Sequence, residues 1–192
     1  MTPENERVIP MRKSLLAAAA AATLLLASGC SGLNKDASPD ASPPHNEADV
    51  AFAQMMIPHH QQAIEMAALA ETRAESQDVK DLAAAIKAAQ DPEIQTMEGW
   101  LESWDETGAS HEMTHEEMPG MVDEKTMGEL GKATGTEFDR LFLTSMIAHH
   151  EGAIAMARSE KSDGVHKGAL RLADAIIETQ TAEIKRMKGM LG

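Results

Sequence analysis

A large internal repeat is the feature that most constrains how this chain can fold. Residues 52–102 and 142–192 align without a gap at an offset of 90, and 19 of the 51 paired positions are identical. A repeated unit of this length is not the short period of a solenoid, so it indicates two copies of one supersecondary unit. Both copies carry two adjacent histidines bracketed by methionines, in MMIPHHQQAIEMA at residues 55–67 and SMIAHHEGAIAMA at residues 145–157.

Each copy contains two segments with helical periodicity. We expect helices over about residues 49–75, 78–104, 137–160 and 165–190, because apolar side chains placed at 100° per residue fall on one core-facing stripe. The chain has 3% aromatic residues and no Tyr, whereas strands favour aromatic and β-branched residues. Short turns make each pair antiparallel. The predicted fold is all-α: a four-helix bundle of two duplicated antiparallel helical hairpins, with helices that continue, kinked, through Pro58 and Pro92.

The chain divides into a signal peptide, a flexible linker and one domain. Residues 1–30 read as a signal peptide with a lipobox: two basic residues precede an apolar stretch too short for a membrane span, and the stretch ends in ASGC. Translation starts at Met1 or Met11. Residues 31–47 read as a flexible linker. Residues 48–192 form the bundle domain, with repeat halves 48–105 and 137–192 and a connection at 106–136.

Cys30 is the only cysteine, so neither an intrachain disulfide nor a multi-thiolate metal site is available. If Cys30 is lipidated, the protein is an extracytoplasmic lipoprotein anchored at the cell surface or in the periplasm. The alternative is an ordinary secretory signal with an incidental cysteine. The net charge of −14 argues against a nucleic-acid partner and is compatible with cations.

Polar residues share the apolar stripes in both halves. His59 and His60 lie on the first stripe, Gln90 and Glu93 lie on the second, and all four recur 90 residues later. A buried glutamate is rare unless it is paired. Two explanations are open. In one, a His–Glu hydrogen-bond network fixes the register of the helices without a metal. In the other, histidine and methionine bind a metal and each glutamate accepts a histidine N–H in the outer shell.

The metal hypothesis names a soft set of ligands. A methionine stripe alone is usually core filler, but thioethers combined with imidazoles suit Cu(I) far better than Mg, Ca or Mn. Ag(I) would accept the same ligands, and zinc would favour Cys or three histidines. The predicted ligands are Met56, His59, His60, Met66, Met97, Met146, His149, His150, Met156 and Met187, with Glu93 and Glu183 as outer partners.

The connection offers a possible second site. Its sequence HEMTHEEMPGM supplies His111, Met113, His115, Met118 and Met121. The segment is acidic and has no core pattern, so we expect its methionines to be exposed and available to a soft metal. The alternative is a flexible loop in which these residues occur by chance.

The doubled pattern MI-x-HH-x-x-AI-x-M, at residues 56–66 and 146–156, resembles a bacterial secreted family catalogued as domain of unknown function number 305. The resemblance covers residues 48–192. It implies a ferritin-like four-helix bundle, and some members of the family are extracytoplasmic copper-binding proteins linked to copper tolerance. We therefore expect a copper(I)-binding lipoprotein that acts in sequestration, handover or tolerance and is not an enzyme.

Two rival functions remain. One is a metal-free structural or interaction bundle. The other is a di-metal carboxylate enzyme, which would need inward Glu-x-x-His pairs on two helices. It is disfavoured because residues 56, 57, 146 and 147 are Met or Ile.

Overall fold

The computed structural model describes residues 44–107 and 118–192, which hold five helices. They are α1 (Glu47–Arg73), α2 (Gln77–Ser103), α3 (Glu124–Leu130), α4 (Gly135–Asp163) and α5 (Lys167–Leu191). The four long helices confirm the predicted all-α fold, whereas the short helix α3 was not predicted. The signal peptide, Cys30, most of the linker, His111, Met113 and His115 lie outside the described residues.

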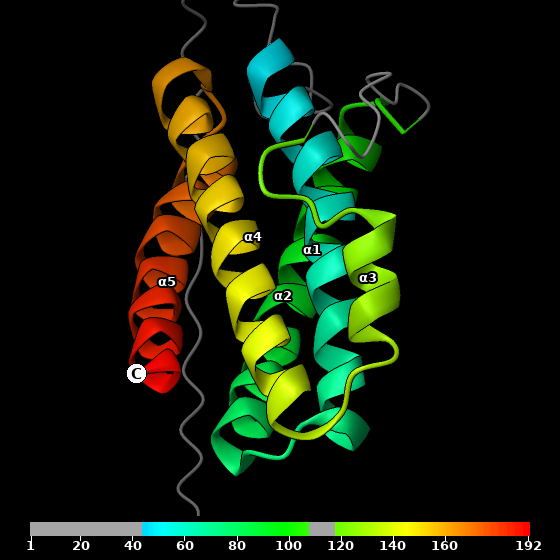
Figure 1. Cartoon of the computed structure of the whole chain (residues 1–192). Helices are drawn as coiled ribbons and strands as arrows, with labels where there is room; N and C mark the ends of the chain where they lie inside the picture. Colours follow the sequence, from blue (N-terminus) through cyan, green and yellow to red (C-terminus); the bar gives the residue numbers. More distant parts are fainter. Residues whose placement is uncertain (1–43, 108–117) are drawn as a thin grey trace, which may run out of the picture. The chain divides into compact units, whose positions relative to one another are not determined.

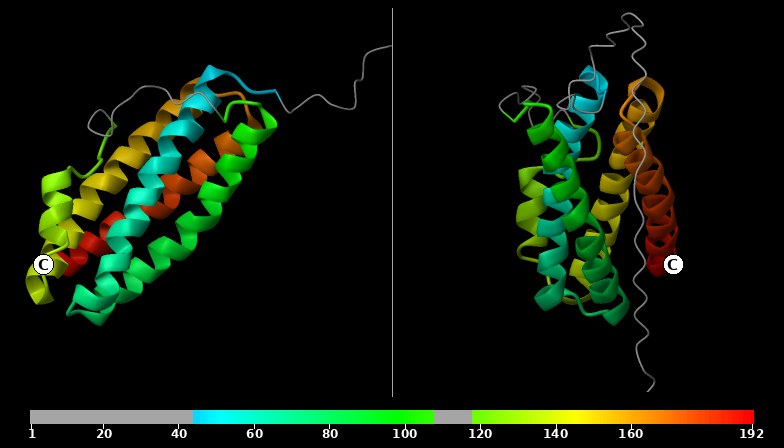
Figure 2. Two further views of the ribbon diagram at one scale, coloured as in Figure 1. Left: turned by 90° about the vertical axis from the view of Figure 1, so that its right-hand side faces the viewer. Right: turned by 180° about the vertical axis from the view of Figure 1, so that it is seen from behind.

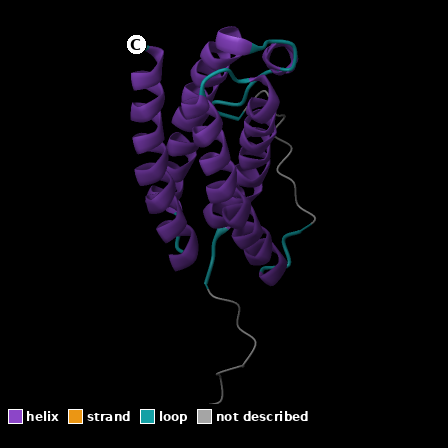
Figure 3. Cartoon of the chain, turned by 90° about the horizontal axis from the view of Figure 1, so that it is seen from below, coloured by secondary structure: helices purple, strands orange, loops and turns teal. Residues whose placement is uncertain are grey.

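The helices form a bundle of two hairpins. Helix α1 packs against α2, α4 packs against α5, and the two hairpins meet mainly through α1 and α4 (Figures 1 and 2). Turns of only three residues, 74–76 and 164–166, connect the helices within each hairpin. The coloured part of Figure 3 contains helices and loops, and no strand is present in residues 44–107 or 118–192. The seam between α1 and α4 is therefore the centre of the fold.

Local sequence fixes where α1 begins and how it continues. The Asn46 side chain accepts hydrogen bonds from the N–H groups of Ala48 and Asp49, and the Asp49 carboxylate accepts the N–H of Asn46, which forms a capping box. Pro58 and Pro92 lie inside α1 and α2, as expected for helices that continue through a proline.

The hydrophobic core is divided into two clusters, and each contains three methionines. One holds Met66, Met146 and Met187, and the other holds Met56, Met97 and Met156. The offset of 90 exchanges the two sets, so the duplicated sequence produces a duplicated core. The four tandem histidines lie near the midpoints of α1 and α4 and belong to neither cluster.

Two aspartates at the starts of α1 and α4 bind the turn of the opposite hairpin. Asp49 accepts the N–H groups of Val165 and His166, at 3.1 and 2.8 Å. Asp139 accepts those of Glu75 and Ser76, at 3.1 and 2.9 Å. The two sets of contacts are related by the offset of 90. The pair lies three residues before the aligned segments 52–102 and 142–192, so the repeat extended to Asp49 and Asp139 is the sequence signal for it.

Glu160 lies buried at the end of α4. Burial and, after it, the neighbouring Asp49 carboxylate raise the pKa of Glu160 from its ordinary value of 4.5 to about 8. Between these two pH values the folded chain keeps a proton on Glu160 that the unfolded chain has released. The contribution of Glu160 to the free energy of unfolding therefore falls as the pH rises through this window.

We expect Glu160→Gln to remove this dependence, because a neutral amide carries no proton that the fold must retain. Relative to the parent protein, the variant should gain about 1–3 kcal/mol of stability between pH 5 and pH 8, since one pKa unit corresponds to about 1.4 kcal/mol. Urea unfolding at both pH values measures the difference. Glu178→Gln, at an exposed position of α5, is the matched control. Parallel stability–pH curves for the parent protein and Glu160→Gln would contradict the assignment.

Candidate metal centre

Helical geometry points the two histidines of each pair in different directions. Consecutive residues of a helix lie 100° apart, so His59 and His149 face one another across the α1–α4 seam while His60 and His150 turn toward α2 and α5. The ring centroids of His59 and His149 are 3.7 Å apart. All four side chains are buried. Since a metal–imidazole bond is about 2 Å long, rings this close can contribute nitrogens to one ion.

Carboxylates hold the two outer histidines. His60 Nε2 lies 2.7 Å from Glu93 Oε2, and His150 Nε2 lies 2.6 Å from Glu183 Oε2. An ionised carboxylate can only accept, so Nε2 carries a proton in both rings. Neither Nδ1 has a hydrogen-bond partner among the described residues. This is the arrangement in which an outer carboxylate orients a ligating histidine.

The two histidines that face each other across the seam, His59 and His149, have fewer hydrogen-bond partners. His59 Nε2 lies 3.1 Å from the carbonyl oxygen of Pro119, and its Nδ1 has no partner in the described part of the chain. Neither ring nitrogen of His149 has a partner there. Burial and the neighbouring His60 lower the pKa of His59 to about 3, and burial and His59 lower the pKa of His149 well below 6.5. Both rings are therefore neutral at pH 7, the form that binds metal ions.

The remaining predicted ligands are methionines of the hydrophobic core. The six methionines on α1, α2, α4 and α5 are all buried, three in each core cluster. Within residues 44–107 and 118–192, no group of three or more His, Cys, Asp or Glu side chains could hold a metal ion. An ion bound at the seam would therefore need thioethers beside the imidazoles, which is a donor set for a soft ion. A ligand set for a di-metal carboxylate enzyme is not preassembled among these residues.

The connection behaves differently from our expectation. Met118 is only 6% exposed, so the prediction that the methionines of this segment are exposed is wrong for this residue. Met121 is half-buried. The reason is that residues 118–122 pack against α1 and α4, a contact that no repeated pattern in the sequence indicates. The possible loop site itself stays a prediction, because His111, Met113 and His115 lie outside the described residues.

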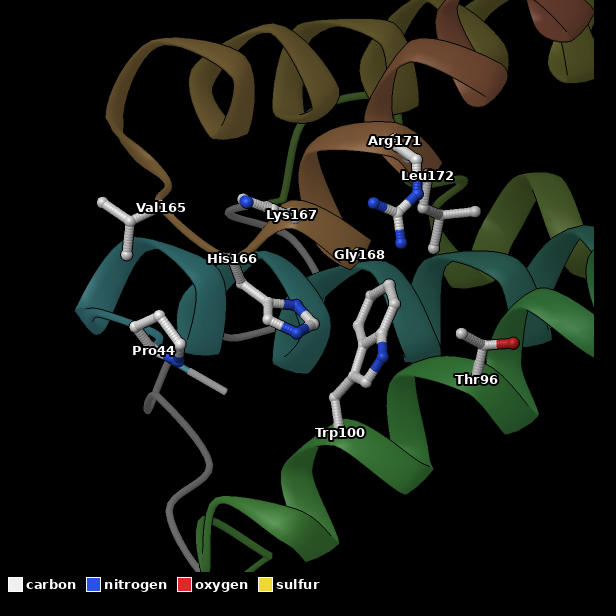
Figure 4. A pocket seen from close by; sticks show the side chains of 9 residues that line it. All are labelled: Pro44, Thr96, Trp100, Val165, His166, Lys167, Gly168, Arg171 and Leu172. Carbon is white, nitrogen blue, oxygen red and sulfur yellow. The ribbon is translucent and has the colours of Figure 1, made fainter. Parts of the chain in front are cut away.

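A surface pocket near the beginning of α5 has a different chemistry. Trp100 of α2 and His166, Lys167 and Arg171 at the start of α5 surround it (Figure 4). The two cationic side chains disfavour a metal cation, and none of the residues that line the pocket is a predicted ligand. The histidine seam remains the candidate metal centre.

Comparisons with known proteins find one family of similar chains. The model of the DUF305 family, a domain of unknown function, matches residues 49–191. A DUF305 protein from Streptomyces coelicolor, provisionally described as secreted, is 32% identical with a TM-score of 0.71, and the match covers 75% of this chain and 91% of that one. A DUF305 fragment from Deinococcus radiodurans is 34% identical with a TM-score of 0.71, over 78% and 99%.

A third similar structure is CopM in its Cu(I)-bound form, which is 36% identical with a TM-score of 0.63 over 74% of this chain and 94% of CopM. CopM has also been solved in Ag-bound, Cu(II)-bound and apo forms. Among curated proteins, no relative matches the chain.

Proposed function

Because the chain belongs to the DUF305 family, we propose that it binds a soft monovalent ion, Cu(I) with Ag(I) as a chemical substitute, at the histidine seam. The observation that carries the proposal is the set of four buried imidazoles between two methionine clusters, whose Nδ1 atoms have no partner in the described residues. The known binding of Cu(I) and Ag by CopM supports the same ion class.

The energetics of burial favour this function. A buried polar atom without a hydrogen bond costs about 1–3 kcal/mol. The seam contains five such ring nitrogens, two of them on His149. An ion that accepts a lone pair from some of these rings and from thioethers offsets part of the cost, because thioether and imidazole ligands suit Cu(I). No catalytic step is required, so the proposed role is sequestration or handover of the ion.

The proposed place of action is outside the cytoplasm, on a membrane to which lipidated Cys30 tethers the bundle. The lipobox-like ASGC stretch supports this proposal, as does the provisional description of the relative from Streptomyces coelicolor. None of the described helices is long and apolar enough to span a bilayer.

A second candidate function rests on the two His–Glu pairs. A metal-free bundle could use His60–Glu93 and His150–Glu183 to fix helix register, since such pairs can specify an arrangement of helices without adding stability. This role accounts for the outer histidines. It leaves His149 without a purpose, because neither of its ring nitrogens has a partner in the described structure.

Competition for Cu(I) tests the proposed function. Residues 31–192 are titrated against a chromophoric Cu(I) chelator, with Zn(II) competition measured in parallel. We expect Cu(I) to be withdrawn from the chelator at nanomolar strength or tighter, on the order of −12 kcal/mol, and Zn(II) to bind far more weakly. A variant with Met113→Leu, in the connection, should retain the affinity. A folded protein that leaves all Cu(I) on the chelator would contradict the proposal.

A further inference from the structure

Residues 118–122 form a strap across the seam between α1 and α4. The carbonyl of Pro119 lies 3.1 Å from His59 Nε2. Three residues later, the Gln62 side chain of α1 makes two hydrogen bonds to the backbone of Val122: its Nε2 donates to the carbonyl and its Oε1 accepts the N–H, both at 2.8 Å. With Met118 buried at the other end, the strap is held on both sides of the Pro119 carbonyl.

On the α4 side, the strap lies so close to the helix that only glycine fits beneath it. A Cβ added to Gly152 would lie 2.0 Å from the Pro119 oxygen, and a Cβ added to Gly120 would lie 2.6 Å from the Ala148 oxygen. Gly120 also has a φ of +79°, in the left-handed region that glycine favours.

Gln62 and Gly152 occupy equivalent positions of the repeat, since their numbers differ by 90. The two halves therefore diverge where the strap needs a hydrogen-bonding side chain on α1 and a bare backbone on α4. The equivalent histidines of the two halves also differ in their hydrogen bonds. His59 bonds to the strap, whereas its counterpart His149 has no hydrogen-bond partner in the described residues.

We propose that the strap is a positioning element of the ion site, whose Pro119 carbonyl holds the His59 ring with its proton on Nε2. A carbonyl oxygen only accepts hydrogen bonds, so the contact selects the tautomer in which Nδ1 carries the lone pair. Pro119 does for His59 what Glu93 and Glu183 do for His60 and His150. The consequence for ion binding rests on the proposed function, but the choice of tautomer does not.

Gly152→Ala tests the proposal without removing a ligand. Alanine is favoured over glycine inside a helix, so α4 is preserved while the new Cβ forces the strap away from His59. The matched control is Gly189→Ala on α5, where a Cβ would meet nothing within 4 Å. Nitrogen-15 NMR of the histidine rings in the metal-free proteins reports the tautomer of His59, and Ag(I) titration reports the affinity.

We expect His59 to be protonated on Nε2 in the parent and control proteins and to become a mixture of tautomers in Gly152→Ala. The Ag(I) affinity of Gly152→Ala should fall about tenfold, at the lower end of the effect of losing an outer-shell partner. The proposal is overturned if the His59 tautomer in Gly152→Ala is the same as in the parent. It is also overturned if the parent binds Ag(I) and Gly152→Ala binds it with the same affinity. If the parent binds no Ag(I), the proposed function fails while the tautomer still decides the role of the strap.

Gln62→Leu provides a second test of the proposal in case Gly152→Ala does not fold. It releases Val122 without placing an atom against α4, and it should shift the His59 tautomer in the same direction. If the Gln62→Leu protein folds and loses the hydrogen bonds to Val122 but His59 keeps its tautomer, the strap does not position His59.

Discussion

A double variant carrying His59→Leu and His149→Leu is expected to lose Ag(I) binding while its metal-free fold remains at least as stable as that of the parent. Leucine is an apolar helix former of similar size, and it removes three ring nitrogens that have no partner in the described structure. Removing an unpartnered buried polar group recovers about 1–3 kcal/mol, which offsets the loss of the His59 bond to Pro119.

Thermal unfolding with and without Ag(I) measures both effects. At a free ion concentration of 100 times Kd, binding stabilises a protein by about 2.7 kcal/mol. We expect this increment in the parent and almost none in the double variant, which corresponds to an affinity loss on the order of 100-fold or more.

His45→Leu, at a histidine that precedes α1 and stacks on Trp104, is the control and should keep the full increment. A double variant that is still stabilised by Ag(I) would place the ion elsewhere. One that unfolds without metal would support the structural role.

Asp139→Ala should destabilise the fold by about 2–4 kcal/mol, the largest effect on stability that we expect from one exchange at the ends of the bundle. The carboxylate accepts the N–H groups of Glu75 and Ser76 in the turn between α1 and α2. Its removal leaves two part-buried backbone hydrogen bonds without their acceptor, and each such unsatisfied donor costs about 1–3 kcal/mol.

Urea unfolding of the metal-free protein gives the change. Asp139→Asn should recover part of the loss, because its side-chain oxygen can still accept one N–H. Asp81→Ala is the control: its exposed carboxylate bonds only to the exposed Gln77 side chain, so it should cost less than about 0.5 kcal/mol. Equal midpoints for Asp139→Ala and Asp81→Ala would show that the contact between the hairpins contributes nothing.

The repeat allowed most of the fold to be predicted. Helical periodicity located α1, α2, α4 and α5, and the presence of His and Glu on apolar stripes indicated contacts between histidines and glutamates. The structure shows which ones pair: His60 with Glu93 and His150 with Glu183. These features are periodic and occur in both halves of the repeat, so a pattern found in one half is supported by its recurrence in the other. Which of these side chains bind an ion stays a prediction.

The features that were not predicted lie where the repeat ends. Helix α3 and the strap belong to the connection, which has no second copy. The acceptor for His59 is a backbone carbonyl, and every residue has one, so no residue type marks it. Asp49 and Asp139 look like ordinary helix-start residues in the sequence, and only the tertiary contact shows that each one binds the turn of the other hairpin.

The most direct test of the account follows the histidine rings of the full bundle by nitrogen-15 NMR while Ag(I) is added to one equivalent. We predict that the Nδ1 signal of His59 and one ring-nitrogen signal of His149 move from lone-pair to ion-bound positions together, while the Nε2–H groups of His60 and His150 stay hydrogen-bonded to Glu93 and Glu183. Tight binding of Ag(I) that leaves the signals of His59 and His149 where they were would contradict the central claim that the ion is captured at the seam.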